Sequence, residues 1–157
     1  MVNSILVIGI GNESRADDAA GLFVAQRLIA LNLPQVCVLE HSGEGASLID
    51  TWESSGAQFV ILIDAVCSGA EPGTIYRLDV NEQTIPTSFF NYSTHAFSLA
   101  EAAELARVLG KLPPNAVIYG IEGSRYAAGA ALSEAVAQAI PFTLTKIVRE
   151  IGLILRS

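Results

Sequence analysis

Three polar residues stand where predicted strands end, and their types suit a metal ion. Asp18 follows a first apolar run, Asp64 lies near the end of another, and His95 closes a long polar loop. In an open, mainly parallel sheet, ligands bind beyond the carboxyl ends of the strands, so these side chains converge if the first and third strands are neighbours. Two carboxylates and one imidazole suit a borderline divalent ion such as Zn²⁺, Ni²⁺ or Fe²⁺. No H-E-x-x-H motif completes a zinc site, which favours transient binding of a metal supplied by another molecule.

Among the three candidate residues, Asp64 gives the strongest single indication of a functional site. It follows five apolar residues, Phe59–Ile63, and a charge there is costly unless something compensates it. The alternative is a carboxylate that only caps a backbone N–H at the strand end. His95 taken alone is an ordinary helix-start or surface histidine, and His41, the only other histidine, is the substitute ligand. We interpret Asp17 as a helix cap or a solvated partner.

The turn before Asp18 offers a competing interpretation, a dinucleotide site. Gly9-Ile-Gly11 supplies the first two glycines of G-x-G-x-x-G, but Ser14 occupies the third position. Glu13 and the two aspartates add negative charge where a pyrophosphate needs bare N–H groups. The turn therefore favours a cation over a nucleotide.

A nucleophilic mechanism is the next alternative, with Cys67, Asp64 and His95 as a thiol triad. No basic residue flanks Cys67 in the sequence to favour the thiolate, and no G-x-S-x-G elbow is present. Both absences disfavour a cysteine or serine mechanism.

The elements that must position these residues alternate between strand and helix. The hydrophobic patterns predict strands at 5–10, 36–39, 59–66, 74–80 and 116–121, and helices at 19–31, 46–54, 98–109 and 132–155. The third strand is apolar on both faces, so it should be central, and its link to the fourth is too short for a parallel crossover. We expect an α/β fold in a single domain, residues 1–157: a three-layer sandwich whose five-stranded, twisted, mostly parallel sheet has one antiparallel strand near an edge and helices on both faces.

The amino-acid composition restricts the classes of partner that the chain is expected to bind. The net charge of −7 and a pI near 4.7 argue against nucleic acid and anionic membranes. No apolar run approaches the roughly 18 residues that span a bilayer, and no secretory signal is visible. Cys37 and Cys67 are interpreted as buried thiols in a reducing compartment. We expect a cytoplasmic monomer.

Several short motifs occur in series along nearly the whole chain. They are Gly9–Gly21 (GIGNESRADDAAG), Ile63–Ala65, Pro72–Thr74, Ser93–His95, Gly120–Glu122 and Gly129–Ser133. This series resembles the hydrogenase maturation proteases, endopeptidases that trim the C-terminal extension of the nickel-containing large subunit of [NiFe] hydrogenases. The first motif is fairly specific, and the others are convincing only in series.

The resemblance implies roles for residues of this chain. The nickel-contacting residues of the family carry over onto Asp18, Asp64 and His95, the same three that position and chemistry select. The nickel would belong to the substrate, so no tightly bound cofactor is expected. The implied partner is the nickel-loaded large-subunit precursor of a [NiFe] hydrogenase.

Two hypotheses about activity follow from the resemblance. In the first, nickel polarises the scissile carbonyl or a water molecule while Asp18 or Asp64 assists proton transfer, so that the metal ligands are also the catalytic residues. In the second, the chain is a non-catalytic nickel-site chaperone or assembly factor for the same subunit.

Overall fold

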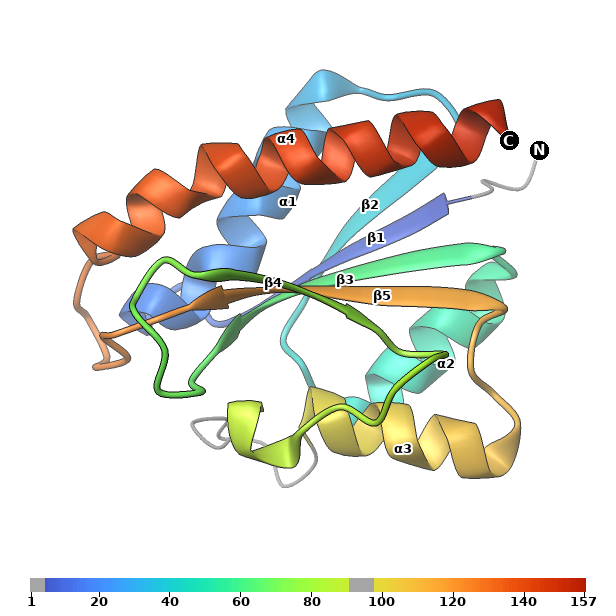
Figure 1. The fold of residues 1–157 in the computed structure, drawn as a ribbon, viewed down its shortest axis with the longest axis horizontal. Coiled ribbons are helices and arrows are strands. Elements are labelled where there is room, and N and C mark those ends of the chain that lie inside the picture. Colours follow the sequence, from blue (N-terminus) through green and yellow to red (C-terminus); the bar gives the residue numbers. More distant parts are fainter. Residues whose placement is uncertain (1–4, 91–97) are drawn as a thin grey trace.

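The computed structural model describes residues 5–90 and 98–157, which form a five-stranded sheet covered by helices on both faces (Figure 1). The strands are β1 (Ile5–Ile10), β2 (Val36–His41), β3 (Phe59–Val66), β4 (Ile75–Asp79) and β5 (Asn115–Glu122). The helices are α1 (Ala20–Leu31), α2 (Gly45–Ser55), α3 (Leu99–Leu109) and α4 (Glu134–Arg156), with short 3-10 helices η1 (Ala16–Ala19) and η2 (Thr87–Phe90).

The sheet topology confirms the predicted fold. The strand order is β2-β1-β3-β5-β4, and β4 at one edge is the antiparallel strand. The strands β1 and β3 pair in parallel, so their carboxyl ends lie side by side. The convergence of Asp18 and Asp64 depends on this pairing.

The central strand β3 contributes to two separate cores. Val60 and Leu62 belong to the cluster on the side of α2 and α3, whereas Ile61 and Ile63 belong to the cluster on the side of α1 and α4. The alternation follows from the two-residue period of a strand. Because both faces are covered, β3 is apolar along most of its length, as predicted.

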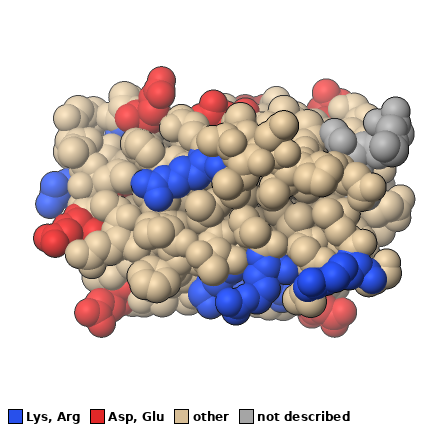
Figure 2. All heavy atoms as spheres, turned by 90° about the horizontal axis from the view of Figure 1, so that it is seen from above, with Lys and Arg blue, Asp and Glu red and all other residues tan. Residues whose placement is uncertain are grey.

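The helices α1 and α4 form the upper layer of Figure 1. Seen from that side, most of the surface is uncharged, and the Lys and Arg side chains gather mainly along one edge (Figure 2). Within the described residues, none of the helices combines the length and apolar composition needed to cross a bilayer.

Glycines let α1 lie directly against the sheet. A Cβ at Gly9 would run into the Gly21 carbonyl oxygen and the Ala25 side chain. A Cβ at Gly21 would run into the carbonyl oxygens of Ile10 and Ile63. Close backbone approach therefore accounts for the first glycine of the G-x-G pattern without any nucleotide.

The start of the first helix corrects a prediction. The α-helix begins at Ala20, after η1, and its N-terminal flank, Ala19, makes no side-chain capping bond. Neither Asp17 nor Asp18 opens the α-helix as a cap, because η1 intervenes. Ala16 has φ of 52°, and this left-handed residue redirects the chain just before the two aspartates.

The second strand is longer than predicted. It continues to His41, in register with Ile10 of β1, instead of ending at residue 39. Strand β2 is an edge strand, and its last residues are polar, so hydrophobicity alone could not show that pairing continues. Helix α3 begins with a capping box, in which the side chains of Ser98 and Glu101 accept hydrogen bonds from each other's backbone N–H groups.

Candidate active site

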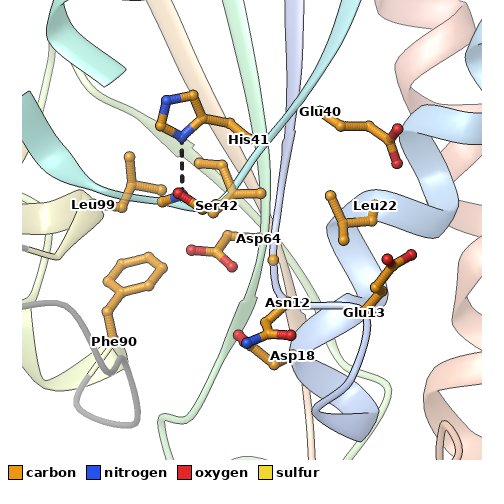
Figure 3. A pocket seen from close by; sticks show the side chains of 13 residues that line it. Asn12, Glu13, Asp18, Leu22, Glu40, His41, Ser42, Asp64, Phe90 and Leu99 are labelled. Carbon is orange, nitrogen blue, oxygen red and sulfur yellow. Dashed lines mark hydrogen bonds between the residues drawn. The ribbon is translucent and has the colours of Figure 1, made fainter. Parts of the chain in front are cut away.

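A pocket of about 450 Å³ opens at the carboxyl ends of β1, β2 and β3. Asp18 and Asp64 both line it, from η1 and β3, and the close-up in Figure 3 shows both side chains at this pocket. The structure therefore brings two of the three predicted site residues together. His95 lies outside the described residues. Its predicted place in the site stays a prediction.

Asp64 lies within β3, two residues before its end, and its residue surface is 5% exposed. The Asp64 Oδ1 atom accepts a hydrogen bond of 2.8 Å from the Ala65 backbone N–H. This bond is the strand-end cap of the alternative interpretation. Because the same side chain lines the pocket, capping and a role in the site are compatible.

Asp18 reaches the pocket from η1, and it is partly exposed. Its backbone N–H donates to the Arg15 carbonyl over 3.0 Å. A Cβ at Gly11 would run into the Asp18 carbonyl oxygen, so the glycine lets the segment after β1 pass directly over η1. Gly11, the second glycine of the G-x-G pattern, thus helps to place the Asp18 carboxylate at the pocket.

Asp17 is neither a cap of the first helix nor a solvated partner, which corrects the prediction. It is fully buried, and its Oδ2 accepts hydrogen bonds from the backbone N–H groups of Ser124 and Arg125 at 2.8 and 2.9 Å. Its Oδ1 accepts from the Ser133 N–H at 2.7 Å, and Ser133 Oγ donates to Oδ2 at 2.9 Å. Asp17 therefore joins η1 to the loop between β5 and α4.

His41 lines the pocket, but its ring is engaged in the β2–α2 loop. The Gly43 backbone N–H donates to Nδ1 over 2.9 Å, and Nε2 lies 3.0 Å from Ser47 Oγ. With Nδ1 accepting, the proton of a neutral ring sits on Nε2, which donates to the serine. As a substitute ligand, His41 would have to give up one of these contacts.

Two further carboxylates line the pocket. Glu13 follows β1, and Glu40 lies at the end of β2, where Gln26 Nε2 donates to its Oε1 over 2.8 Å. No Lys or Arg lines this pocket among the described residues. The site is thus strongly negative and favours a cationic group. Sequence reasoning missed Glu40 because it ended the second strand too early.

One wall of the pocket is apolar. Phe90 of η2 and Leu99 of α3 lie on the side of Asp64, and Leu22 of α1 lies on the opposite side (Figure 3). Phe90 and Leu99 are buried. An apolar wall beside a carboxylate lowers the local dielectric constant and strengthens its interaction with a cation.

Partly buried hydrogen bonds connect the ends of β3 and β5 next to the pocket. Glu122, at the end of β5, is 2% exposed and accepts from the Ser68 N–H and Oγ, the latter over 2.6 Å. The Tyr126 hydroxyl donates to the Val66 carbonyl over 2.8 Å, and burial raises the pKa of this phenol, which keeps it protonated as a donor. The exits of β3 and β5 are therefore held rigidly.

The described residues include no group of three or more His, Cys, Asp or Glu arranged to hold a metal ion. What they provide is a pair of carboxylates, Asp18 and Asp64, at one pocket. Such a pair can bind part of a metal's coordination sphere or accept a proton from an attacking water molecule.

Comparison with known proteins identifies the family. Residues 24–150 match the family model described as hydrogenase maturation protease. A putative hydrogenase maturation protease of Methanocaldococcus jannaschii is 32% identical over 151 residues, which cover 94% of this chain and 96% of the relative. The hydrogenase 2 maturation protease of Escherichia coli is 29% identical over 121 residues, 74% of this chain and 71% of the relative.

Solved structures share the fold. The hydrogenase maturating endopeptidase HybD of E. coli superposes with a TM-score of 0.72 at 23% identity, covering 94% of this chain and 93% of the other. The [NiFe] hydrogenase maturation protease HycI of Thermococcus kodakarensis gives the same TM-score and identity, covering 94% and 91%. With the match of the family model, these findings confirm the predicted resemblance: the chain belongs to the hydrogenase maturation protease family, and it is an endopeptidase.

Proposed function

We propose that this endopeptidase removes the C-terminal extension of the nickel-loaded large-subunit precursor of a [NiFe] hydrogenase. The nickel is part of the substrate, and it docks against Asp18, Asp64 and His95. The observation that carries the proposal is that Asp18 and Asp64, which are 46 positions apart in the sequence, line one negatively charged pocket in a member of this family.

The pocket suits a metal ion that is already held by another molecule. A structural metal site usually closes its coordination sphere with protein ligands, whereas this chain would complete a sphere that the precursor supplies in part. Carboxylate and imidazole ligands match the borderline character of nickel. The requirement for nickel would then restrict cleavage to precursors that have received their metal.

The carboxylates would also serve the hydrolysis. With the scissile carbonyl placed beside the metal, a water oxygen attacks the carbonyl carbon and its proton passes to Asp18 or Asp64. Collapse of the tetrahedral intermediate breaks the C–N bond, and the same carboxyl group returns the proton to the leaving amine. The apolar wall formed by Phe90 and Leu99 limits bulk water around these carboxylates.

The test is incubation of the purified chain with a nickel-loaded precursor, followed by mass spectrometry of the intact precursor. We expect a mass loss equal to a short C-terminal peptide. Asp64→Asn and His95→Ala should each lower the rate by at least about a hundredfold, because each removes a ligand from the reacting centre. Asp50→Asn, at an exposed position of α2, is the matched control and should cut at the wild-type rate.

Two results would overturn the proposal. Stable complex formation without loss of mass would identify a chaperone or assembly factor. Equal cleavage of nickel-free and nickel-loaded precursor would show that nickel is not needed for substrate recognition, although the chain would still be a peptidase.

A further inference from the structure

A second cavity, of about 560 Å³, lies between α4 and the strands β3, β5 and β4, away from the active site. Its apolar residues include Phe59 and Ile75 from the strands, and Leu153 and Ile154 from α4. Leu153 is 59% exposed. We call this cavity the α4 groove. It begins at Phe59, the first residue of β3, and five residues of strand, about 17 Å, separate Phe59 from Asp64 in the active site.

Positive charge borders the apolar surface of the α4 groove on the side of α4. Lys146 and Arg149 line it from successive turns of α4, both exposed, and neither makes a hydrogen bond or ion pair with any of the described residues. Figure 2 shows Lys and Arg side chains gathered along one edge of the face on which α4 lies. Such a gathering of positive charge is unexpected in a chain whose net charge is −7.

The one acidic side chain among the groove's lining residues is already neutralised. Arg77 of β4 donates from Nε and from one terminal nitrogen to the two oxygens of Glu150, at 3.0 and 2.7 Å. The hydroxyl of Tyr119 donates to the same carboxylate. Glu150 therefore does not cancel the charges of Lys146 and Arg149, which remain available to an incoming anion.

An edge strand borders the α4 groove. Strand β4 pairs on one side with β5, and within residues 5–90 and 98–157 no strand pairs with its other side. Two of its residues, Ile75 and Arg77, line the groove. Edge strands present backbone N–H and C=O groups that an extended peptide can pair with. The groove thus combines a backbone template, an apolar surface and two unpaired cations.

We infer that the α4 groove binds an extended peptide segment that carries carboxylates and an apolar side chain. The segment belongs to the hydrogenase precursor, so this inference rests on the proposed function. It lies beside β4, inserts its apolar residue between Ile75 and Leu153, and pairs its carboxylates with Lys146 and Arg149. A second copy of this chain docked groove to groove would bring the same cations together, which disfavours self-association.

The distance between the two sites defines the role of the segment. About 17 Å of strand corresponds to at least five extended residues, so the segment cannot be the bond that is cut. It provides a second anchor for the precursor, and it should affect binding and leave the chemical step unchanged.

The test measures binding of the nickel-loaded precursor, in the Asp64→Asn background so that the precursor stays intact. Lys146→Glu and Arg149→Glu, singly and together, are compared with Arg27→Glu, an exposed position of α1 in the same helical layer. We expect the double variant to raise the dissociation constant about tenfold, as lost and reversed ion pairs at a rim do, and Arg27→Glu to change it less than twofold. Raising the salt concentration should shrink the difference.

Each outcome decides the question. Equal affinity of the double variant and the Arg27→Glu control overturns the inference, and the single variants serve if the double variant fails to fold. Because Asp64→Asn also removes a nickel ligand, absence of measurable binding in that background leaves the decision to the KM comparison, in which an unchanged KM overturns the inference. In otherwise wild-type protein, Lys146→Glu with Arg149→Glu should raise KM and leave kcat unchanged. A wild-type chain that binds the precursor through these cations without cutting it would refute the proposed function alone.

Discussion

Asp17 and Asp18 are adjacent in the sequence but face different surroundings. Asp17 is fully buried and accepts four hydrogen bonds from residues 124, 125 and 133, whereas Asp18 is partly exposed at the pocket. The sequence predicted that two neighbouring carboxylates would not share one role. It could not reveal the partners of Asp17, because they lie more than 100 positions away and are mostly backbone N–H groups, which every residue type supplies.

Asp17→Asn should destabilise the fold. The amide NH₂ would face N–H donors that now point at a carboxylate oxygen, and buried donors left without acceptors are costly. We expect the free energy of unfolding to fall by roughly 3 kcal/mol, measured by urea denaturation. Asp50→Asn on the surface should change it by less than about 0.5 kcal/mol. Equal stability of the two variants would contradict the assigned role of Asp17.

Glu150 gives stability a dependence on acid pH. Burial alone would raise its pKa, but hydrogen bonds from Arg77 and Tyr119 outweigh burial and hold the pKa below the ordinary 4.5. The folded chain then binds fewer protons than the unfolded chain as pH falls below about 4.5, so this contribution to stability is present at neutral pH and is lost in acid.

Glu150→Gln should remove that contribution. Because Arg77 is half exposed, we expect a loss of only about 1 kcal/mol at pH 7, shrinking as the pH falls below about 4.5. Urea denaturation at a series of pH values from 7 to 3 measures it. A difference between variant and wild type that stays constant across this range would show that the carboxylate charge is not what stabilises the cluster.

At the scale of elements, backbone packing governs how α1 meets the sheet. Gly21 lies inside α1, where alanine would be preferred by about 1 kcal/mol on helix propensity. A Cβ there would meet the carbonyl oxygens of Ile10 and Ile63, which belong to two strands and cannot move aside. Packing should therefore make alanine at position 21 destabilising, although helix propensity alone would make it stabilising.

Gly21→Ala should lower the free energy of unfolding by about 3 kcal/mol, the upper range for overpacking. Gly152→Ala in α4 is the matched control, since its Cβ would lie 3.8 Å from one Arg156 nitrogen and meet nothing closer. It should stabilise the chain by about 0.5 kcal/mol through helix propensity. Thermal and urea unfolding measure both variants. A stabilising Gly21→Ala would refute the packing argument.

How well the bounds of each element could be predicted depends on the polarity and the backbone conformation of its residues. The strand at 59–66 was predicted with its observed bounds, because a strand buried on both sheet faces leaves a long apolar run, interrupted here by Asp64. The end of β2 was missed, because Glu40 and His41 continue the pairing with polar side chains at a sheet edge. The start of α1 was predicted to within one residue, but the 3-10 helix η1 before it was missed, because η1 begins with Ala16 at positive φ, which its residue type does not indicate.

At the scale of the whole molecule, charge is divided between two cavities. The active-site pocket contains Glu13, Asp18, Glu40 and Asp64, whereas the α4 groove presents Lys146 and Arg149. The net charge of −7 predicted only that polyanions are poor partners, because a sum cannot locate charge. The location comes from the crossing of strands and helices, which brings together residues from distant segments.

The central claim is that the nickel of the precursor acquires ligands from this chain. X-ray absorption at the nickel edge measures this directly in a rapidly frozen mixture of chain and nickel-loaded precursor. We predict additional oxygen or nitrogen neighbours at about 2.1 Å on mixing, and their loss with Asp64→Asn. A nickel coordination sphere that stays unchanged on mixing, while the wild-type chain still cuts the precursor, would contradict the account.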